Sequence, residues 1–400
     1  MSKLEVDTIA PQSGTTVTLG ESGDTITVPS GATLDTSNST VTLPDGSVSN
    51  AKLANSSITL NGNSVSLGGS ASIASGMFRN IIINGDMSIA QRATSTSSIT
   101  STGYQTLDRF KTNISSLGTW TQSQSTDVPS GQGFATSLKM DCTTADASPS
   151  ASDKLLIQQL IEGQNLQYLK KGTANAESLT LSFWVKSNKT GTYIANLYDG
   201  DNTRQISKSY TISSADTWEK KIITFAGDTS GAFNNDNGVS LYLQLYLGAG
   251  SNFTSGTLAT SWESATNANA AVGQVNLADS TANEWYITGV QLEAGTTASD
   301  FEFLPYDVNF TRCQRYYQVL APGGVKYIPI VQYQAGFRSL AQTFPTEMRT
   351  APTFTVDTYN GFTSFNGSEL TTNTIHAYED ISYSVASSLI VRGVRLDAEL

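Results

Sequence analysis

One strand-like stretch carries aromatic and polar side chains opposite an apolar face. In VSLYLQLYLG, residues 239–248, Val239 and the leucines alternate, which leaves Tyr242, Gln244 and Tyr246 together on the second face. Two aromatic rings around an amide suit a sugar, because its C–H face stacks on π-systems and its hydroxyls need hydrogen-bonding partners. This face is a candidate carbohydrate contact.

The stretch LTLSFWVK, residues 179–186, repeats the pattern. Its apolar residues face one way, whereas Ser182, Trp184 and Lys186 face the other. Trp184 and Lys186 are therefore further candidate glycan contacts. A second interpretation stays open for both stretches: the faces pack against a neighbouring subunit or an overlying loop, since protein interfaces are also enriched in Tyr and Trp.

A third candidate lies near the C-terminus, in YNGFTSFNG, residues 359–367. Tyr359 directly precedes the first of two Asn-Gly turn signals, and Phe362 and Phe365 lie between the two, so a hairpin or loop would expose at least one ring. These residues are candidate glycan contacts at a rival site. Alternatively, Phe362 and Phe365 close the end of a trimeric knob.

Residues suited to catalysis are sparse. The chain has one histidine, His376, and no G-x-S-x-G, H-E-x-x-H or Walker-type sequence. A glycosidase needs only two carboxylates about 5 to 10 Å apart, so glycan cleavage remains an alternative. The acidic turn Asp199-Gly-Asp201-Asn202 lacks a full set of Ca²⁺ ligands. We expect no enzyme activity, no cofactor and no metal.

The composition limits both fold and partners. Only 14% of the residues are charged, and Thr, Ser, Asn and Gly dominate, which favours strands over helices. The net charge is −11 and no Lys/Arg run exceeds two, so nucleic acid is not an expected partner. The opening MSKLEVDTIAPQSG has no apolar core and no stretch approaches about 20 apolar residues, so we expect neither a signal peptide nor membrane insertion. Cys142 and Cys313 make no disulfide framework.

The first 77 residues differ from the rest, because every Phe, Tyr and Trp lies at Phe78 or beyond. They contain a loose repeat of alternating polar and apolar residues closed by Gly or Pro, in TVTLG (16–20), TITVP (25–29), TVTLPDG (40–46), SITLNG (57–62) and SVSLGG (64–69). Two apolar residues on each face bury too little area, at about 25 cal/mol per Å², to offset about 1 to 2 kcal/mol of backbone entropy per residue. We therefore expect three copies to wrap around a common axis.

Longer strands are predicted after Phe78, at 179–187, 192–200, 218–227, 239–248 and 284–295, in the arrangement of a two-sheet sandwich. KLLIQQLIEG, residues 154–163, fits either a helix or a strand. After Pro305, residues 310–318 fit a short helix or connector, and strands follow at 325–334, 352–359, 381–385 and 388–400. The predicted fold is all-β, with a thin trimeric β-repeat shaft, a jelly-roll β-sandwich and a small C-terminal β domain.

Several stretches resemble tail fibres of tailed bacteriophages, especially those of marine and cyanobacterial hosts. MSKLEVDTIAPQSGTTVTLG looks like their virion-proximal anchor, and FRNIIINGDMSIAQR, YQTLDRF, SFWVKSN and ITGVQLEAG are similar to their carbohydrate-binding-module-like jelly roll. CQRYYQ, FPTEMRTAPTFTV and the ending LDAEL look like their distal region. The resemblance implies a virion-attachment segment at 1–20, a shaft at 21–77, a jelly roll at 78–305 and a knob at 306–400.

The resemblance also implies partners. It predicts a homotrimer that attaches through its N-terminus to tail, baseplate or adaptor proteins, is made in the host cytoplasm and becomes part of the virion. Host-surface polysaccharide or lipopolysaccharide is the expected receptor. If that receptor is anionic, local cations such as Lys186, Arg338 and Arg349 must offset the negative charge of the chain. The alternatives are a purely structural fibre and a glycan-depolymerising tailspike.

Overall fold

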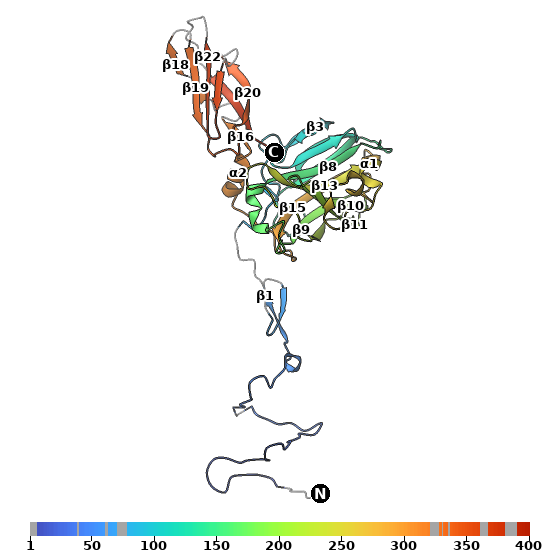
Figure 1. Ribbon diagram of the computed structural model, residues 1–400, viewed down its shortest axis with the longest axis vertical. Coiled ribbons are helices and arrows are strands. Elements are labelled where there is room, and N and C mark those ends of the chain that lie inside the picture. Colours follow the sequence, from blue (N-terminus) through green and yellow to red (C-terminus); the bar gives the residue numbers. More distant parts are fainter. Residues whose placement is uncertain are drawn as a thin grey trace. The chain divides into compact units, whose positions relative to one another are not determined.

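The computed structural model describes residues 6–37, 40–60, 63–69, 78–320, 328–329, 331–334, 337–360, 367–380 and 390–400. The chain divides into two compact units, Met1–Ile73 and Ala74–Leu400, close to the expected start of the sandwich at residue 78. Strands dominate, and the longest helix is α2 (Tyr306–Gln314), so the prediction of an all-β fold is confirmed (Figure 1).

In the first unit, two of the five repeats form strands. β1 (Ser57–Leu60) and β2 (Asn63–Ser66) make an antiparallel hairpin with Ile58 opposite Val65. The repeats at 16–20, 25–29 and 40–46 contain no strand in the single chain, and their strands in a three-chain shaft stay a prediction. Their apolar side chains are between 39% and 65% exposed. A single copy offers these segments neither a pairing strand nor an apolar surface.

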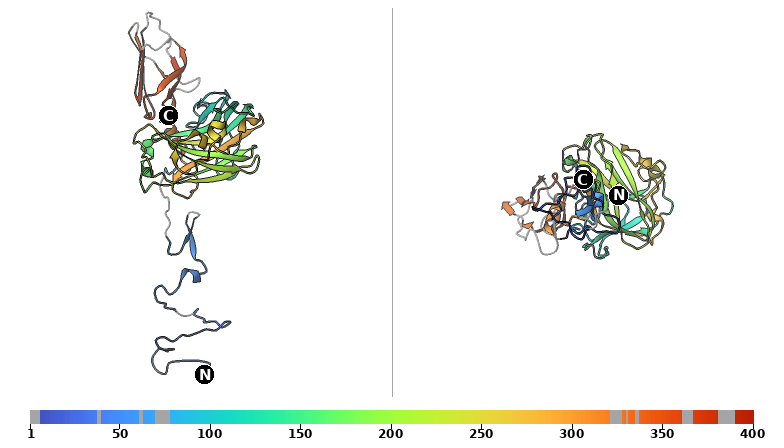
Figure 2. Two further views of the ribbon diagram at one scale, coloured as in Figure 1. Left: turned by 45° about the vertical axis from the view of Figure 1, so that its right-hand side comes forward. Right: turned by 90° about the horizontal axis from the view of Figure 1, so that it is seen from below.

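The second unit begins with a β-sandwich (Figure 2). Its first sheet has seven antiparallel strands in the order β14-β11-β10-β13-β8-β5-β4. Along the chain these are β4 (Gly103–Tyr104), β5 (Lys111–Ser115), β8 (Lys154–Glu162), β10 (Gly191–Asp199), β11 (Arg204–Ile212), β13 (Val239–Ala249) and β14 (Glu263–Ser264). The ambiguous stretch 154–163 is thus a strand. Because β8 is buried on both faces, its apolar residues do not alternate.

The second sheet has six antiparallel strands in the order β12-β9-β15-β7-β6-β3. They are β3 (Ser95–Ile99), β6 (Thr119–Ser125), β7 (Ser137–Thr144), β9 (Leu179–Ser187), β12 (Glu219–Phe225) and β15 (Glu284–Ala294). All five strands predicted between 179 and 295 are confirmed, to within two residues at each end. Short helical turns complete the sandwich: η2 (Gly163–Asn165), η3 (Gln167–Leu169), α1 (Ser251–Thr254), η4 (Asn267–Asn269) and η5 (Leu277–Asp279), while η1 (Asn50–Lys52) lies in the first unit.

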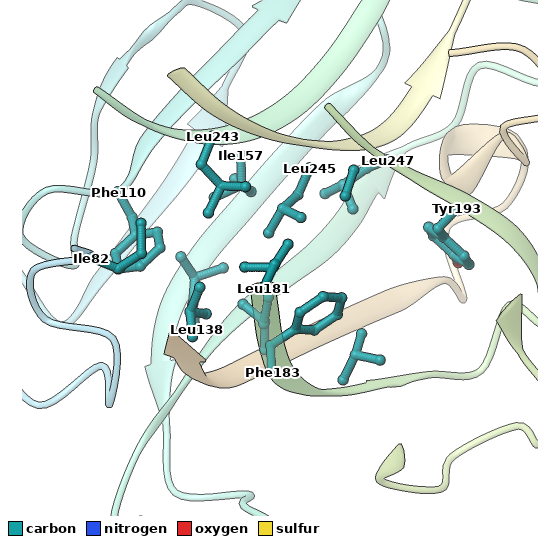
Figure 3. Packing of buried hydrophobic residues seen from close by; sticks show 14 of the residues in the cluster. Ile82, Phe110, Leu138, Ile157, Leu181, Phe183, Tyr193, Leu243, Leu245 and Leu247 are labelled. Atoms are coloured by element: carbon teal, nitrogen blue, oxygen red, sulfur yellow. The ribbon is translucent and has the colours of Figure 1, made fainter. Parts of the chain in front are cut away.

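The core of the sandwich lies between the two sheets. Figure 3 shows Leu243, Leu245 and Leu247 of β13 on one side and Leu181 and Phe183 of β9 on the other. All five side chains are at most 1% exposed. The alternation therefore identified the buried face of both strands correctly, and it follows that the intervening residues of β13 and β9 lie on the outer faces of the sheets.

Residues 306–400 form two further four-stranded sheets. One contains β16 (Tyr317–Leu320), β17 (Ile328–Pro329), β20 (Thr353–Asn360) and β23 (Ile390–Asp397); the other contains β18 (Val331–Gln334), β19 (Phe337–Thr343), β21 (Gly367–Leu370) and β22 (Thr374–Asp380). The strands predicted at 352–359 and 388–400 are present. The predicted strand at 325–334 corresponds to two short strands, β17 and β18, in different sheets, and the one at 381–385 lies outside the described residues. β16, β19, β21 and β22 were not predicted.

Contacts with the sandwich hold both ends of this C-terminal region. Asn309 in α2 donates to the Asp86 carboxylate at 3.1 Å, and Arg315 forms two hydrogen bonds with the Glu162 carboxylate at 2.8 and 2.9 Å. The hydroxyl of Tyr104 in β4 donates to the carbonyl of Leu400 at 3.1 Å. The expected domains at 78–305 and 306–400 thus share one compact unit, and their finer division stays a prediction. None of the described helices has the length and apolar character needed to cross a membrane.

Candidate functional site

A cleft of about 310 Å³ opens on the outer face of the second sheet, beside Trp184 of β9. The indole is partly exposed, whereas both neighbours along the strand, Phe183 and Val185, point into the core. The strand pairing puts Lys220 of β12 on one side of Trp184 and Thr288 of β15 on the other. Trp184 therefore occupies a fixed position on three hydrogen-bonded strands.

Three phenyl rings form an aromatic wall of this cleft. Phe134, Phe301 and Phe303 lie 4.8 to 5.1 Å apart between ring centroids, and Phe303 is 51% exposed. Gly289, at the bulge in β15, has a φ of +63° and makes room for Phe134, because a Cβ there would lie 2.5 Å from the ring. The bulge thus lets an aromatic ring approach the sheet closely.

Polar groups complete the cleft. Ser182 of β9, Gln132, Asp300 and Lys220 line it together with the rings. Lys220 is exposed and makes no ion pair within the part of the chain that the structure describes. The cleft therefore combines flat apolar surfaces with a hydroxyl, an amide, a carboxylate and an ammonium group, which is the combination expected of a site for a polar, ring-shaped ligand.

Lys186 does not line this cleft. Its side chain is 11% exposed and forms an ion pair with Asp127, while its ammonium group lies 4.3 Å from the ring centroid of Tyr286. Burial acts to raise the pKa of Asp127, but hydrogen bonds from Lys186 and Trp218 outweigh it and hold the pKa below its usual value. The prediction of Lys186 as an available ligand contact is therefore corrected, because Asp127 neutralises it.

The second predicted face, on β13, is open at one end only. Tyr242 and Gln244 are partly exposed, and the Tyr242 ring meets Tyr198 of β10 edge to face at 5.4 Å between centroids. Gln244 donates to Gln158 of β8 at 3.4 Å. Tyr242 and Gln244 therefore stay candidate contacts, on the sheet opposite to the cleft.

Tyr246 is 4% exposed, so its prediction as a sugar contact is corrected. It packs with Leu156 and Ile194 beneath the loop that follows β13, in a cluster completed by Phe253, Leu258, Ala270 and Ala271. Burial raises the pKa of its hydroxyl. At Tyr246, therefore, the face packs against an overlying loop.

The remaining candidates give no site here. Tyr359 belongs to β20, but its side chain, Phe362, Phe365 and the side chain of Arg338 lie outside the described residues. His376 is exposed on β22. The Asp199 carboxylate accepts the backbone N–H groups of Asp201 and Asn202 at 3.0 and 3.1 Å, as in an ordinary turn. No group of three or more His, Cys, Asp or Glu among the described residues is placed to hold a metal.

The sequence made Trp184 a candidate but did not point to the residues that lie around it in the cleft. Phe134 and the pair Phe301 and Phe303 come from segments at least 45 residues away from β9 in the chain, outside the strands that the alternation identified. The signals available were FEFLP, residues 301–305, with two aromatic residues on alternate positions, and the glycine in ITGVQ. Neither shows by itself that the rings converge on Trp184.

Comparison with known proteins gives likenesses in solved structures only, since no protein-family model and no curated protein matches the chain. The enzymatically active domain of tailspike protein 4 of bacteriophage CBA120 is 16% identical, with a TM-score of 0.29; the match covers 54% of this chain and 21% of that one. This chain thus spans about a fifth of the tailspike chain.

Two modules are similar over about half of this chain. A structure described as CBM4 is 12% identical over 53% of this chain and 97% of its own, with a TM-score of 0.27. TmCBM61, in complex with beta-1,4-galactotriose, is 11% identical over 54% of this chain and 99% of its own, with a TM-score of 0.26. All three likenesses are too distant to assign a function to this chain.

Proposed function

We propose that this chain is a non-enzymatic tail-fibre protein of a bacteriophage that binds a glycan on the host surface through the cleft at Trp184. The observation that carries the binding proposal is the cleft itself, with an indole and three phenyl rings beside Ser182, Gln132, Asp300 and Lys220. The fibre role is supported by the sequence resemblance and by the repeats of the first unit.

The chemistry of the cleft suits a sugar ring. The C–H face of a pyranose is apolar and stacks on the face of Trp184, while its hydroxyls exchange hydrogen bonds with Ser182 and Gln132. A volume of about 310 Å³ admits one or two sugar units. A single contact of this size is weak. Several copies acting together raise the avidity by factors on the order of 10² to 10⁴, as firm adsorption requires.

The first unit supports assembly with identical copies. Val17, Leu19, Ile26, Val28 and Leu43 are each at least 39% exposed and recur on alternate positions. Burying such side chains is worth roughly 1.5 to 3 kcal/mol each, and a single chain leaves that stabilisation unused. A threefold arrangement places each small apolar face against two equivalents.

The assembly is tested by mass. Sedimentation or light scattering of the full chain is expected to give about three times its mass of 42.5 kDa. Replacing Ile26 and Val28 by Asp should shift the population towards single chains, because charged side chains cannot pack at the threefold axis. A well-ordered monomer at micromolar concentration would contradict the fibre proposal.

The glycan proposal is tested at Trp184. Trp184→Ala is expected to weaken binding to host-envelope polysaccharide about 10-fold or more, because a stacking surface is lost. Calorimetry or a glycan array with the full chain measures this. The stability should change little, since the indole is partly exposed.

Two variants act as comparisons. Ile222→Ala removes an apolar side chain that is 57% exposed on the same sheet, outside the cleft, and should leave binding unchanged. Tyr242→Ala changes the candidate face on the opposite sheet and shows whether that face contributes to glycan binding. If Trp184→Ala leaves polysaccharide binding intact, the cleft is not the glycan-binding site.

The remaining alternatives have separate readouts. A purely structural fibre would bind neither host cells nor purified envelope polysaccharide and would not compete with the virus for adsorption. A depolymerase would release reducing ends from that polysaccharide, whereas we expect none. Attachment through residues 1–20 to a tail, baseplate or adaptor protein belongs to the same proposal and is tested by assembly of virions with a chain that lacks them.

A further inference from the structure

A second cavity, of about 330 Å³, lies between the beginning of the sandwich segment at Phe78, the end of β8 and helix α2. It shares no lining residue with the cleft at Trp184. Three arginines, Arg109, Arg312 and Arg315, line it. A buried cation is costly unless an opposite charge compensates it, so the partner of each arginine decides whether its charge is available to a ligand.

Two of the three arginines have carboxylate partners. Arg109 forms an ion pair with Glu399, and Arg315 binds the Glu162 carboxylate through two hydrogen bonds of 2.8 and 2.9 Å. Both pairs are largely buried, so these two charges are already neutralised. Neither arginine therefore has spare charge to offer a ligand.

Arg312 differs, because it has no ion pair within the part of the chain that the structure describes. Its only hydrogen bond there is a long one of 3.5 Å to the carbonyl of Asn80. The nearby acid Glu302 accepts the backbone N–H groups of Phe78 and Asn80 at 2.6 and 2.9 Å instead. Burial lowers the pKa of Arg312, so its charge lacks full compensation.

The mouth of the cavity carries apolar and amide groups around this cation. Phe78 and Tyr168 are 52% and 49% exposed, and the Phe78 ring centroid lies 5.9 Å from the Arg312 guanidinium carbon. Asn165 is exposed, and its side chain makes no hydrogen bond with other described residues. Both rings are therefore open to a ligand that also reaches the guanidinium.

We propose that this second cavity binds an acidic sugar unit, with the carboxylate on Arg312 and the ring against Phe78 or Tyr168. The planar guanidinium fork matches a carboxylate, and a cavity of about 330 Å³ holds one hexuronate. The side-chain amide of Asn165 is free to form a hydrogen bond with a hydroxyl of the sugar. The site also resolves an electrostatic conflict, because a chain with a net charge of −11 repels acidic polysaccharide unless a local cation attracts it.

The test uses the full chain and measures binding of glucuronate and short oligouronates by calorimetry or NMR. Arg312→Gln is expected to weaken this binding about 10- to 100-fold, since a charge-assisted pair of hydrogen bonds is lost. Tyr168→Ala changes an exposed side chain, so it tests the site even if Arg312→Gln folds poorly, and it should weaken binding several-fold. Rising salt should weaken binding to the unmodified chain.

Controls separate this site from the cleft at Trp184. Glucose, which lacks the carboxylate, should not bind in the cavity, and Trp184→Ala should leave glucuronate binding unchanged. Inorganic phosphate at matched ionic strength tests whether a bare anion suffices. Equal affinity for phosphate and glucuronate, or glucuronate binding that survives both Arg312→Gln and Tyr168→Ala, overturns the inference. A loss of polysaccharide binding in Trp184→Ala bears on the proposed function of the cleft at Trp184 and not on the acidic-sugar site.

Discussion

Replacing Glu399 by Gln is expected to lower the free energy of unfolding by about 3 to 5 kcal/mol, because it leaves the charge of Arg109 buried without its partner. Arg109 is 1% exposed, and its guanidinium lies 3.5 Å from the ring centroid of Tyr316 and donates to the carbonyl of Leu160. The lost partner comes from a residue 290 positions away in the chain. Chemical denaturation followed by tryptophan fluorescence measures the change.

The same substitution at an exposed pair provides the control. Glu177 pairs with Lys170 at 2.7 Å, with side chains 39% and 55% exposed, so Glu177→Gln should cost less than about 1 kcal/mol. A double variant, Arg109→Met with Glu399→Leu, should recover much of the loss, because it removes both buried charges. If Glu399→Gln costs no more than Glu177→Gln, this buried pair does not join the C-terminal residues to the sandwich.

The second large effect is a pH dependence that arises from Asp108. Burial, opposed by hydrogen bonds from Gln91, raises the pKa of this carboxyl from 3.8 to about 6. A raised pKa in the folded state means that the stabilisation is complete below about pH 4 and is lost as the pH rises through 6. A shift of about 2 pH units corresponds to about 3 kcal/mol lost between pH 4 and pH 7.

Asp108→Asn is expected to remove this pH-dependent loss of stability. The variant also loses a hydrogen bond from Gln91, but that cost does not vary with pH. The slope of the unfolding free energy against pH therefore reports only the titration of Asp108. Asp216→Asn, at an exposed position with a φ of +55° that Asn tolerates, is the matched control. Equal slopes for Asp108→Asn and the unmodified chain between pH 4 and 7 would contradict the assignment.

Alternation along the strands predicted the architecture well because it reports burial directly. Leu181 and Phe183 in β9 and Leu243 in β13 point into the core as expected. The method was ambiguous at β8, where both faces are buried and the period of two disappears. Three repeats of the first unit form no strand in the single chain, because alternation specifies a face and says nothing of whether a pairing strand is present.

The candidate site was harder to predict, because accessibility depends on what covers a face. Trp184 and Lys186 lie on the same side of one strand, yet Trp184 opens to a cleft and Lys186 is neutralised by Asp127 from a distant loop. Tyr242 and Tyr246 diverge in the same way, since a loop after β13 covers only the second. These differences depend on long-range contacts that no local pattern encodes.

The stretches that resemble phage fibres have a visible structural role. Asn80 in FRNIIING donates to the carbonyl of Val290 and accepts from the N–H of Leu292, both in ITGVQLEAG, at 3.0 Å. A Cβ at Gly85 would lie 2.1 Å from the carbonyl oxygen of Val290. These two stretches therefore specify how the first segment packs along β15, which explains why they indicate a fold more strongly than a ligand.

The pairing of β16 with β23 has a consequence for how such a protein diversifies. Leu320 pairs with Val394, so the chain departs for the distal sheets and returns from them at adjacent points, roughly 5 Å apart. Sequence inserted, deleted or exchanged between these two anchors leaves the spacing at the junction unchanged. Loops between these anchors can therefore change in length while β16 stays paired with β23.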